Sequence, residues 1–150
     1  LQGGLDAFNK KDYKTAHQLF LRLAEQGVIR AQYNLGLMYG KGKGVNRNYK
    51  EAIKWYLRAA EKGYSKAQTN LGWMYEKGKG VSVNEQEAAK WYQLASDQGV
   101  TKALEKLTLL LQKNSKNNSK DDLEINSQDD SKKLIGNSYL NAKNFQDLYS

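Results

Sequence analysis

The sequence predicts an all-α protein built as an α-solenoid, in which antiparallel helix pairs stack side by side. Residues 31–66 and 67–102 form a tandem repeat, with 21 identical residues in 36 aligned positions. Inside each copy, apolar residues recur at helical spacing on both sides of a glycine-rich stretch. The chain of 150 residues has 13 glycines and no proline. This combination suits uninterrupted helices that are joined by glycine turns.

Each copy is predicted to form a helical hairpin. Between its two apolar stripes, the segment GKGKGVN would lose about 1 kcal/mol per glycine as helix, so we expect a loop near residues 40–48. An apolar stripe at this spacing is typical of a helix that packs on a neighbour. The stripes of the first copy are Ala31, Leu35, Met38 and Tyr39, and then Ala52, Trp55, Tyr56 and Ala59.

Particular residues are expected to set how the helices join. Gly36, inside the first helix, lets a neighbouring helix approach closely. Trp55 and Tyr56 are expected to fill the gap to the next unit. Gly63 and Gly99 follow the second helices, where a glycine in the left-handed conformation commonly ends a helix.

The two ends of the chain depart from the repeat. Residues 5–30 are predicted to form a degenerate first unit that lacks the glycine loop, and residues 103–113 are predicted to form a terminal helix. We expect a polar linker over 114–130, because it has too few apolar residues to fold alone. Residues 131–150 regain apolar spacing and form a C-terminal helical segment or degenerate cap, a strap lying in a groove, or the start of a further region. Ile135, Gly136 and Tyr139 echo Leu35, Gly36 and Tyr39.

The repeated signature resembles the Sel-one-like repeat family, relatives of the tetratricopeptide repeats. The pattern A-x-x-N-L-G-x-M-Y-x-x-G-x-G-V, followed by E-A-x-K-W-Y and a closing glycine, occurs at 31–66 and again at 67–102. The opening GLDAFNKKDYKTAHQLFLRLAEQG resembles the shortened first unit of bacterial members. The resemblance implies a right-handed, tetratricopeptide-like superhelix that serves as a non-enzymatic adaptor or scaffold for another protein or peptide.

Differences between the copies indicate where a partner binds. Positions 33, 37 and 40 of the first copy differ from 69, 73 and 76 of the second, and they form one stripe away from the shared apolar face. First helices usually line the concave side of such a solenoid, so this stripe is predicted to be a binding groove with Trp73 as its anchor. Alternatively, tight winding or the C-terminal segment buries it. The predicted partner-binding residues are Tyr33, Asn34, Leu37, Thr69, Asn70, Trp73, Glu76, Glu105 and Leu109.

The positive charge lies in the repeats. Residues 1–113 carry 19 Lys+Arg and 10 Asp+Glu, a net +9, whereas residues 114–150 carry 5 and 6, a net −1. The loop lysines form a basic edge, and the first interpretation of such an edge is a solvated rim. As alternatives, it suits an acidic protein surface, or an anionic polymer or membrane surface. Nucleic acid fits poorly, because arginine is scarce and exposed aromatics do not alternate with the lysines. The basic edge comprises Lys41, Lys43, Lys77 and Lys79.

The residues offer no catalytic or metal-binding constellation. There is no cysteine and a single histidine, His17, which stands where the repeats have Ile53 and Ala89. We therefore predict no enzyme activity, cofactor or metal, and GKGKGV lacks the spacing of a phosphate-binding loop. Some cysteine-rich relatives are linked to β-lactam binding or hydrolysis, so an exported hydrolase or small-ligand binder is the alternative, but the repeats have neither cysteine nor a Ser-x-x-Lys set.

No stretch approaches the length of a membrane span, because the longest apolar run is Leu109 to Leu111. The chain begins at Leu1 without a signal-peptide pattern. Together with the resemblance to bacterial proteins that begin shortly after an export signal, this favours the periplasm or secretion over the cytoplasm.

Overall fold

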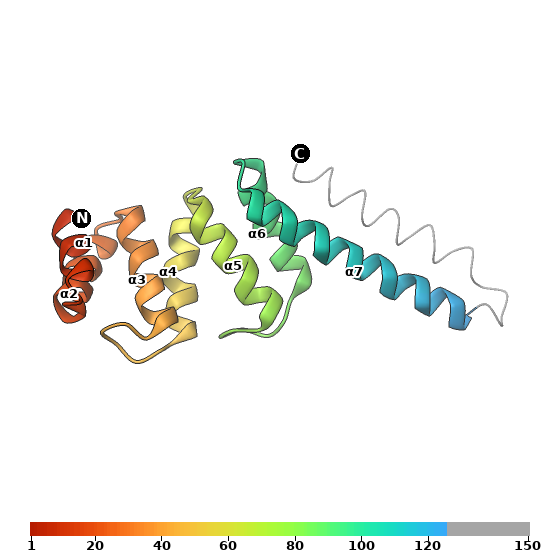
Figure 1. Cartoon of the computed structure of the whole chain (residues 1–150), viewed down its shortest axis with the longest axis horizontal. Helices are drawn as coiled ribbons and strands as arrows, with labels where there is room; N and C mark the ends of the chain where they lie inside the picture. The colour runs from red at the N-terminus through yellow and green to blue at the C-terminus, as the bar shows by residue number, and fades with distance from the viewer. Residues whose placement is uncertain (126–150) are drawn as a thin grey trace.

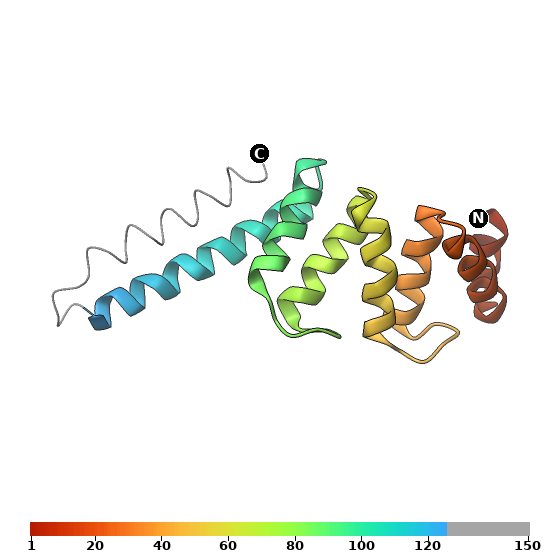
Figure 2. The same ribbon diagram turned by 180° about the vertical axis from the view of Figure 1, so that it is seen from behind.

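The computed structural model describes residues 1–125 of the chain, and these form helices joined by short turns and glycine loops. They lie side by side in sequence order, and the last one extends away from the row (Figure 1). The view from behind shows the same arrangement (Figure 2). The all-α solenoid expected from the sequence is confirmed. The helices are α1 (Gln2–Asn9), α2 (Tyr13–Glu25), α3 (Ile29–Lys41), α4 (Tyr49–Glu61), α5 (Ser65–Lys77), α6 (Glu85–Asp97) and α7 (Thr101–Ile125).

Helix ends follow local capping chemistry. The second helices α2, α4 and α6 each begin after a residue whose side chain accepts a hydrogen bond from a backbone N–H in the first turn of the helix. Gly42 and Gly78 end α3 and α5 in the left-handed conformation, with φ of 65° and 68°. Gly63 and Gly99 have φ of 91° and 90°, as the sequence predicted. The capping residues are Asp12, Asn48 and Asn84.

Glycines also allow helices of one unit to touch. A Cβ atom on Gly36 would lie 2.7 Å from the Tyr56 ring, and one on Gly72 would lie 2.5 Å from the Tyr92 ring. Gly4 relates to Phe20 in the same way in the shortened first unit. These contacts confirm the close approach predicted at Gly36, and they place an aromatic ring directly on a helix backbone.

The core consists of clusters between successive units. One cluster joins α1, α2 and α3 and includes Trp55 of α4, and the next joins α4 and α5 and includes Trp91 of α6. Tyr56 belongs to the cluster with α5, so the prediction that Trp55 and Tyr56 together fill the gap to the next unit is wrong for Trp55. Adjacent positions on a helix point about 100° apart, so Trp55 reaches the cluster of the preceding unit, while Tyr56, which also lies on Gly36 of its own unit, reaches the cluster with α5.

Neighbouring units are also tied by polar contacts at one end of the row. Buried Gln32 and Gln68 donate from Nε2 to the carbonyl oxygens of Ala24 and Ala60, at 3.1 and 3.2 Å. Those carbonyls lie in the last turn of a second helix and also accept from the backbone N–H groups of Gly27 and Gly63, so each glutamine adds a second hydrogen bond. Gln98 Nε2 donates to the Gly63 carbonyl oxygen at 2.9 Å.

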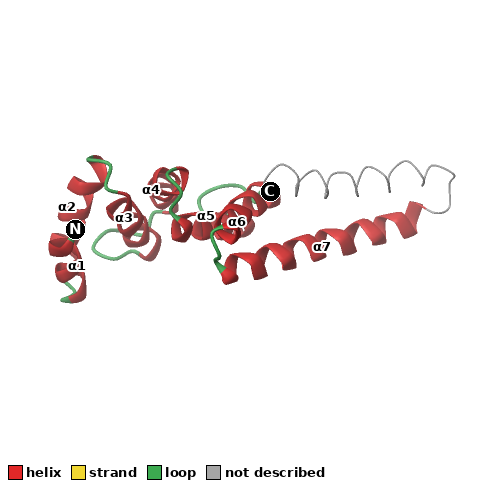
Figure 3. Ribbon diagram, turned by 90° about the horizontal axis from the view of Figure 1, so that it is seen from above, coloured by secondary structure: helices red, strands yellow, loops and turns green. Residues whose placement is uncertain are grey.

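The last helix corrects the expected end of the solenoid. The terminal helix was predicted over 103–113, with a polar linker from 114, but α7 continues without a break to Ile125. Asn114 stands at the position of Gly42 and Gly78, so α7 lacks the glycine that turns the chain after α3 and α5. The predicted linker over 126–130 and C-terminal segment over 131–150 lie outside the described residues. Seen from above, α7 departs obliquely from the row (Figure 3).

Candidate protein-interaction surface

The predicted partner-binding residues lie on the first helices α3, α5 and α7, but their exposure differs strongly. Leu37 and Trp73 are half-buried and pack partly against the core cluster of α4 and α5. Thr69 is buried, and its hydroxyl donates to the Ser65 carbonyl oxygen at 2.9 Å. The stripe is therefore partly or fully covered at these three positions.

Tyr33 and Asn70 take part in an internal aromatic contact between units. The Tyr33 ring lies 5.8 Å from the Tyr56 ring and 5.1 Å from the Tyr64 ring, measured between centroids. Burial raises the pKa of Tyr33, the nearby Tyr64 raises it further, and a hydrogen bond with the Asn70 side chain lowers it. Asn70 is thus a hydrogen-bond partner of tyrosines inside the protein, and Asn34 is half-buried.

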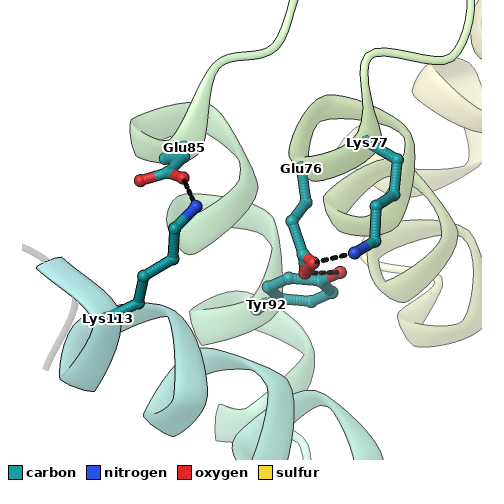
Figure 4. A network of polar contacts seen from close by, with 5 residues as sticks. All are labelled: Glu76, Lys77, Glu85, Tyr92 and Lys113. Atoms are coloured by element: carbon teal, nitrogen blue, oxygen red, sulfur yellow. Dashed lines mark hydrogen bonds and ion pairs between the residues drawn. The ribbon is translucent and has the colours of Figure 1, made fainter.

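Glu76 is held by a polar network at the end of α5 (Figure 4). The Tyr92 hydroxyl donates to Glu76 Oε1 at 3.1 Å, and Lys77 Nζ lies 3.6 Å from Glu76 Oε2. Nearby, Lys113 Nζ of α7 contacts Glu85 Oε1 of α6 at 2.6 Å. Burial and the negative charge of Glu76 both raise the pKa of Tyr92. This phenol stays protonated and keeps its hydrogen bond.

The α7 part of the stripe is open. Leu109 is 65% exposed, and Glu105 is also exposed. Trp73 stands 36 residues earlier, at the same position of α5, and there the side chain is half-buried against the core cluster of α4 and α5. The row Leu37, Trp73 and Leu109 therefore becomes more accessible toward the C-terminal end.

Basic side chains flank this apolar row in every unit, which sequence reasoning missed. Each first helix carries Lys or Arg seven positions before the row residue and Lys four positions after it. At 3.6 residues per turn, these positions fall within about 40° of one another, on a single stripe. All six basic residues are exposed, although Lys77 and Lys113 contact a carboxylate. The three sets are Arg30, Leu37 and Lys41; Lys66, Trp73 and Lys77; and Lys102, Leu109 and Lys113.

The loop lysines of the predicted basic edge are held partly by tyrosines. Lys43 Nζ lies 5.6 Å from the centre of the Tyr13 ring, and Lys79 Nζ lies 5.9 Å from the centre of the Tyr49 ring. Lys41 and Lys77 are exposed. Each loop thus rests on the start of the second helix of the preceding unit, and two of the four lysines lie against half-buried tyrosine rings.

Three further features concern metal ligands, membrane spans and the single histidine. Across residues 1–125, no group of three or more His, Cys, Asp or Glu side chains is placed to hold a metal ion. None of the described helices is long and apolar enough to cross a membrane. His17 is half-buried, with its Nε2 atom 3.2 Å from the Tyr39 hydroxyl oxygen.

The repeat is matched by a known family. The model of the Sel1 repeat matches residues 3–28, 29–64 and 65–100. The chain belongs to the Sel1 repeat family. Sel1 repeats are generally protein-interaction modules, and proteins built from them are generally non-catalytic scaffolds. The prediction of this family is confirmed.

Solved structures of Sel1 repeat proteins are similar to this chain. A Sel1 repeat protein from Oxalobacter formigenes is 42% identical, with a TM-score of 0.69 over 72% of this chain and 44% of that one. A protective antigen of uropathogenic Escherichia coli, c5321, is 32% identical, with a TM-score of 0.72 over 74% of this chain and 25% of that one.

A third similar structure is cysteine-rich protein B of Helicobacter pylori. It is 27% identical, with a TM-score of 0.57, and the match covers 59% of this chain and 67% of that one. This chain thus spans less than half the length of the first two structures. No curated protein matches it.

Proposed function

We propose that this Sel1 repeat protein is a non-enzymatic adaptor that binds an acidic segment of a partner protein along its first helices. The observation that carries the proposal is the basic–apolar–basic set repeated on α3, α5 and α7, with all six basic side chains exposed. An extended segment with apolar side chains between carboxylates would complement the stripe. This is the side that first helices are expected to line as the concave face of a solenoid.

In this proposal, the apolar row of Leu37, Trp73 and Leu109 provides most of the binding energy. The Lys and Arg residues on either side of it attract an acidic partner by long-range electrostatics. Large aromatic side chains often dominate the energy of interfaces, which favours Trp73 as the central anchor. The lysines and the arginine raise the rate of encounter with an acidic partner, an effect that salt weakens. Because Trp73 is half-buried, its ring offers one face to a partner while the rest stabilises the solenoid.

A displayed library of 12-residue peptides, selected on the purified chain, tests the proposal. We expect selected peptides to combine Asp or Glu with aliphatic or aromatic residues, and to bind more weakly as salt rises. Leu109→Ser should weaken binding at least tenfold without changing the melting temperature, because Leu109 is 65% exposed. Trp73→Ala should weaken it further and also lower stability.

The matched control removes the same charge from a different face. Lys66→Ser with Lys102→Ser should reduce binding, whereas Lys14→Ser with Lys50→Ser, on second helices, should not. Selected peptides without acidic residues, or equal loss in both double variants, would overturn the proposed stripe.

A further inference from the structure

The last core cluster lacks a component that the two earlier clusters contain. In each earlier cluster, the second helix of the following unit contributes a buried tryptophan, Trp55 or Trp91, with exposures of 3% and 6%. The third cluster is built from α6 and α7, with Tyr75 packed against it, and holds no such residue among those described. The surface beside this α6–α7 cluster is therefore the place where a further second helix would lie.

Exposure of α7 shows which surface is uncovered. Gln32 and Gln68 are 2% and 3% exposed, but Leu104, at the same position of α7, is 51% exposed. Leu111, seven residues later on the same side of the helix, is 36% exposed. An apolar residue has replaced a polar one where no second helix comes next in the described part of the chain. Two exposed leucines on one side of α7 indicate that an apolar occupant belongs there.

The sequence beyond the described residues repeats the pattern of a second helix. Tyr139, Ala142 and Phe145 have the spacing of Tyr49, Ala52 and Trp55. Ser138 precedes the pattern as Asn48 does, and serine is also a favoured helix N-cap. This register competes with the first-helix register of Ile135, Gly136 and Tyr139. The first-helix register requires a glycine loop after residue 140, and residues 140–150 contain no glycine.

A paired change between the two segments supports the second-helix register. In units two and three, a glycine of the first helix faces a tyrosine ring, as Gly36 faces Tyr56 and Gly72 faces Tyr92. Thr108 replaces this glycine in α7, and its side chain would collide with a ring placed so closely. The residue that would take the place of the tyrosine is Gln146, which is not aromatic. Thr108 is larger than the glycine of the earlier units, and Gln146 is a flexible side chain where those units have a tyrosine ring. The two changes therefore compensate each other.

We propose that residues 138–150 of the same chain are the second helix of a fourth unit and dock on the uncovered surface of α6 and α7, with Phe145 in the place of Trp55 and Trp91. Phenylalanine also suits the place chemically, because Trp55 and Trp91 each bury an indole N–H without a partner. Phe145 completes the cluster without burying such a donor.

The chain is long enough to return. From Lys113 to Ile125, α7 runs 12 residues beyond the end of a normal first helix, about 18 Å at the rise of an α-helix. Residues 126–137 are also 12 in number, and extended chain of that length spans roughly 40 Å. Residue 138 therefore reaches the surface beside the α6–α7 cluster from the end of α7 without any change in α1 to α6.

Thiol protection in the full-length chain tests the proposal, since the protein has no native cysteine. The thiol of Phe145→Cys should react with a maleimide or disulfide reagent at least tenfold more slowly than that of Asn144→Cys. The matching positions in α4 are buried Trp55 and exposed Lys54. Leu104→Asp should abolish the protection of Phe145→Cys, whereas Leu109→Asp, on another side of α7, should leave it intact. The proposal would be overturned if the two thiols react at equal rates or if protection survives Leu104→Asp. It would also be overturned if sedimentation shows a dimer and protection is lost on dilution.

A double-mutant cycle tests the register independently. Gln146→Tyr alone should destabilise the docked segment because the ring meets Thr108, and Thr108→Gly with Gln146→Tyr should restore the glycine–tyrosine contact of the earlier units. We expect the double variant to protect the amides of 139–150 from hydrogen exchange at least tenfold more than Gln146→Tyr alone. Additive effects of the two substitutions would refute this register.

Discussion

Helices α5 and α7 occupy the same position in successive units, and they share the residues that face backward but not those that face forward. Ala67 and Leu71 of α5 correspond to Ala103 and Leu107 of α7, and all four are buried against the preceding second helix. The glycines of α5 that receive the next helix and turn the chain are absent from α7. One set of positions therefore joins a unit to its predecessor, and a separate set of glycines determines whether a helix turns back to form a hairpin.

The largest expected effect comes from the tryptophan that completes an internal cluster. Trp91→Ala should lower the free energy of unfolding by about 3–5 kcal/mol, because Trp91 is 6% exposed and bridges α6 to the α4–α5 cluster. The control Leu109→Ala should change it by less than about 0.5 kcal/mol. Urea titration followed by circular dichroism measures both, and similar losses would show that the two regions do not differ as described.

A smaller effect is expected where the glycine contact is present in one helix and lost in the other. Gly72→Ala should cost about 1–3 kcal/mol, because its Cβ would lie 2.5 Å from the Tyr92 ring, which is fully buried. Thr108→Ala should be close to neutral, or slightly stabilising through helix propensity. The measurement is the melting temperature of each variant, and a neutral Gly72→Ala would mean that the ring moves aside freely.

The repeat made the fold of the internal units predictable, because every core position occurs twice at the same spacing. The identities at Ala31 and Leu35 with Ala67 and Leu71 indicated the buried face, and the glycine loops indicated the hairpins. The repeat could not show which neighbouring helices each core side chain contacts. Trp55 and Tyr56 stand next to each other in sequence, but they belong to different core clusters, which depends on how the units are stacked.

The candidate surface was harder to predict than the core for a related reason. Differences between the copies mark positions free of repeat constraints, but freedom to vary does not mean exposure. Tyr33 and Thr69 differ in type, yet Tyr33 packs between tyrosines and Thr69 satisfies its hydroxyl on its own helix. The basic rows at positions such as Lys66 and Lys102 are present in the sequence. Comparing the helical position of each repeated basic residue with that of the apolar row would have predicted them.

A third test transfers the turn signal to the last helix. Asn114→Gly should favour a break after Lys113, because the left-handed glycine at this position ends α3 and α5. Glycine also costs about 1 kcal/mol inside a helix relative to the best helix formers. We expect faster hydrogen exchange over residues 115–125 and little change over 101–110. Unchanged exchange across 115–125 would mean that α7 is held straight by more than the absence of glycine.

The smallest expected effect is a pH dependence of stability that comes from His17 in the first unit. The second unit has Ile53 at this position. Burial lowers the pKa of His17, so folding favours the neutral ring that lies against the Tyr39 hydroxyl. The unfolded chain then binds a proton more readily, and this contribution to stability is full above pH about 6.5 and is lost as pH falls below that value. Because the ring is half-exposed, the loss should stay under about 1 kcal/mol. Urea titrations at pH 7.5 and 5.5 should show a smaller drop for His17→Ile than for the wild type, and since the chain has no other histidine, equal drops would exclude His17 as the source.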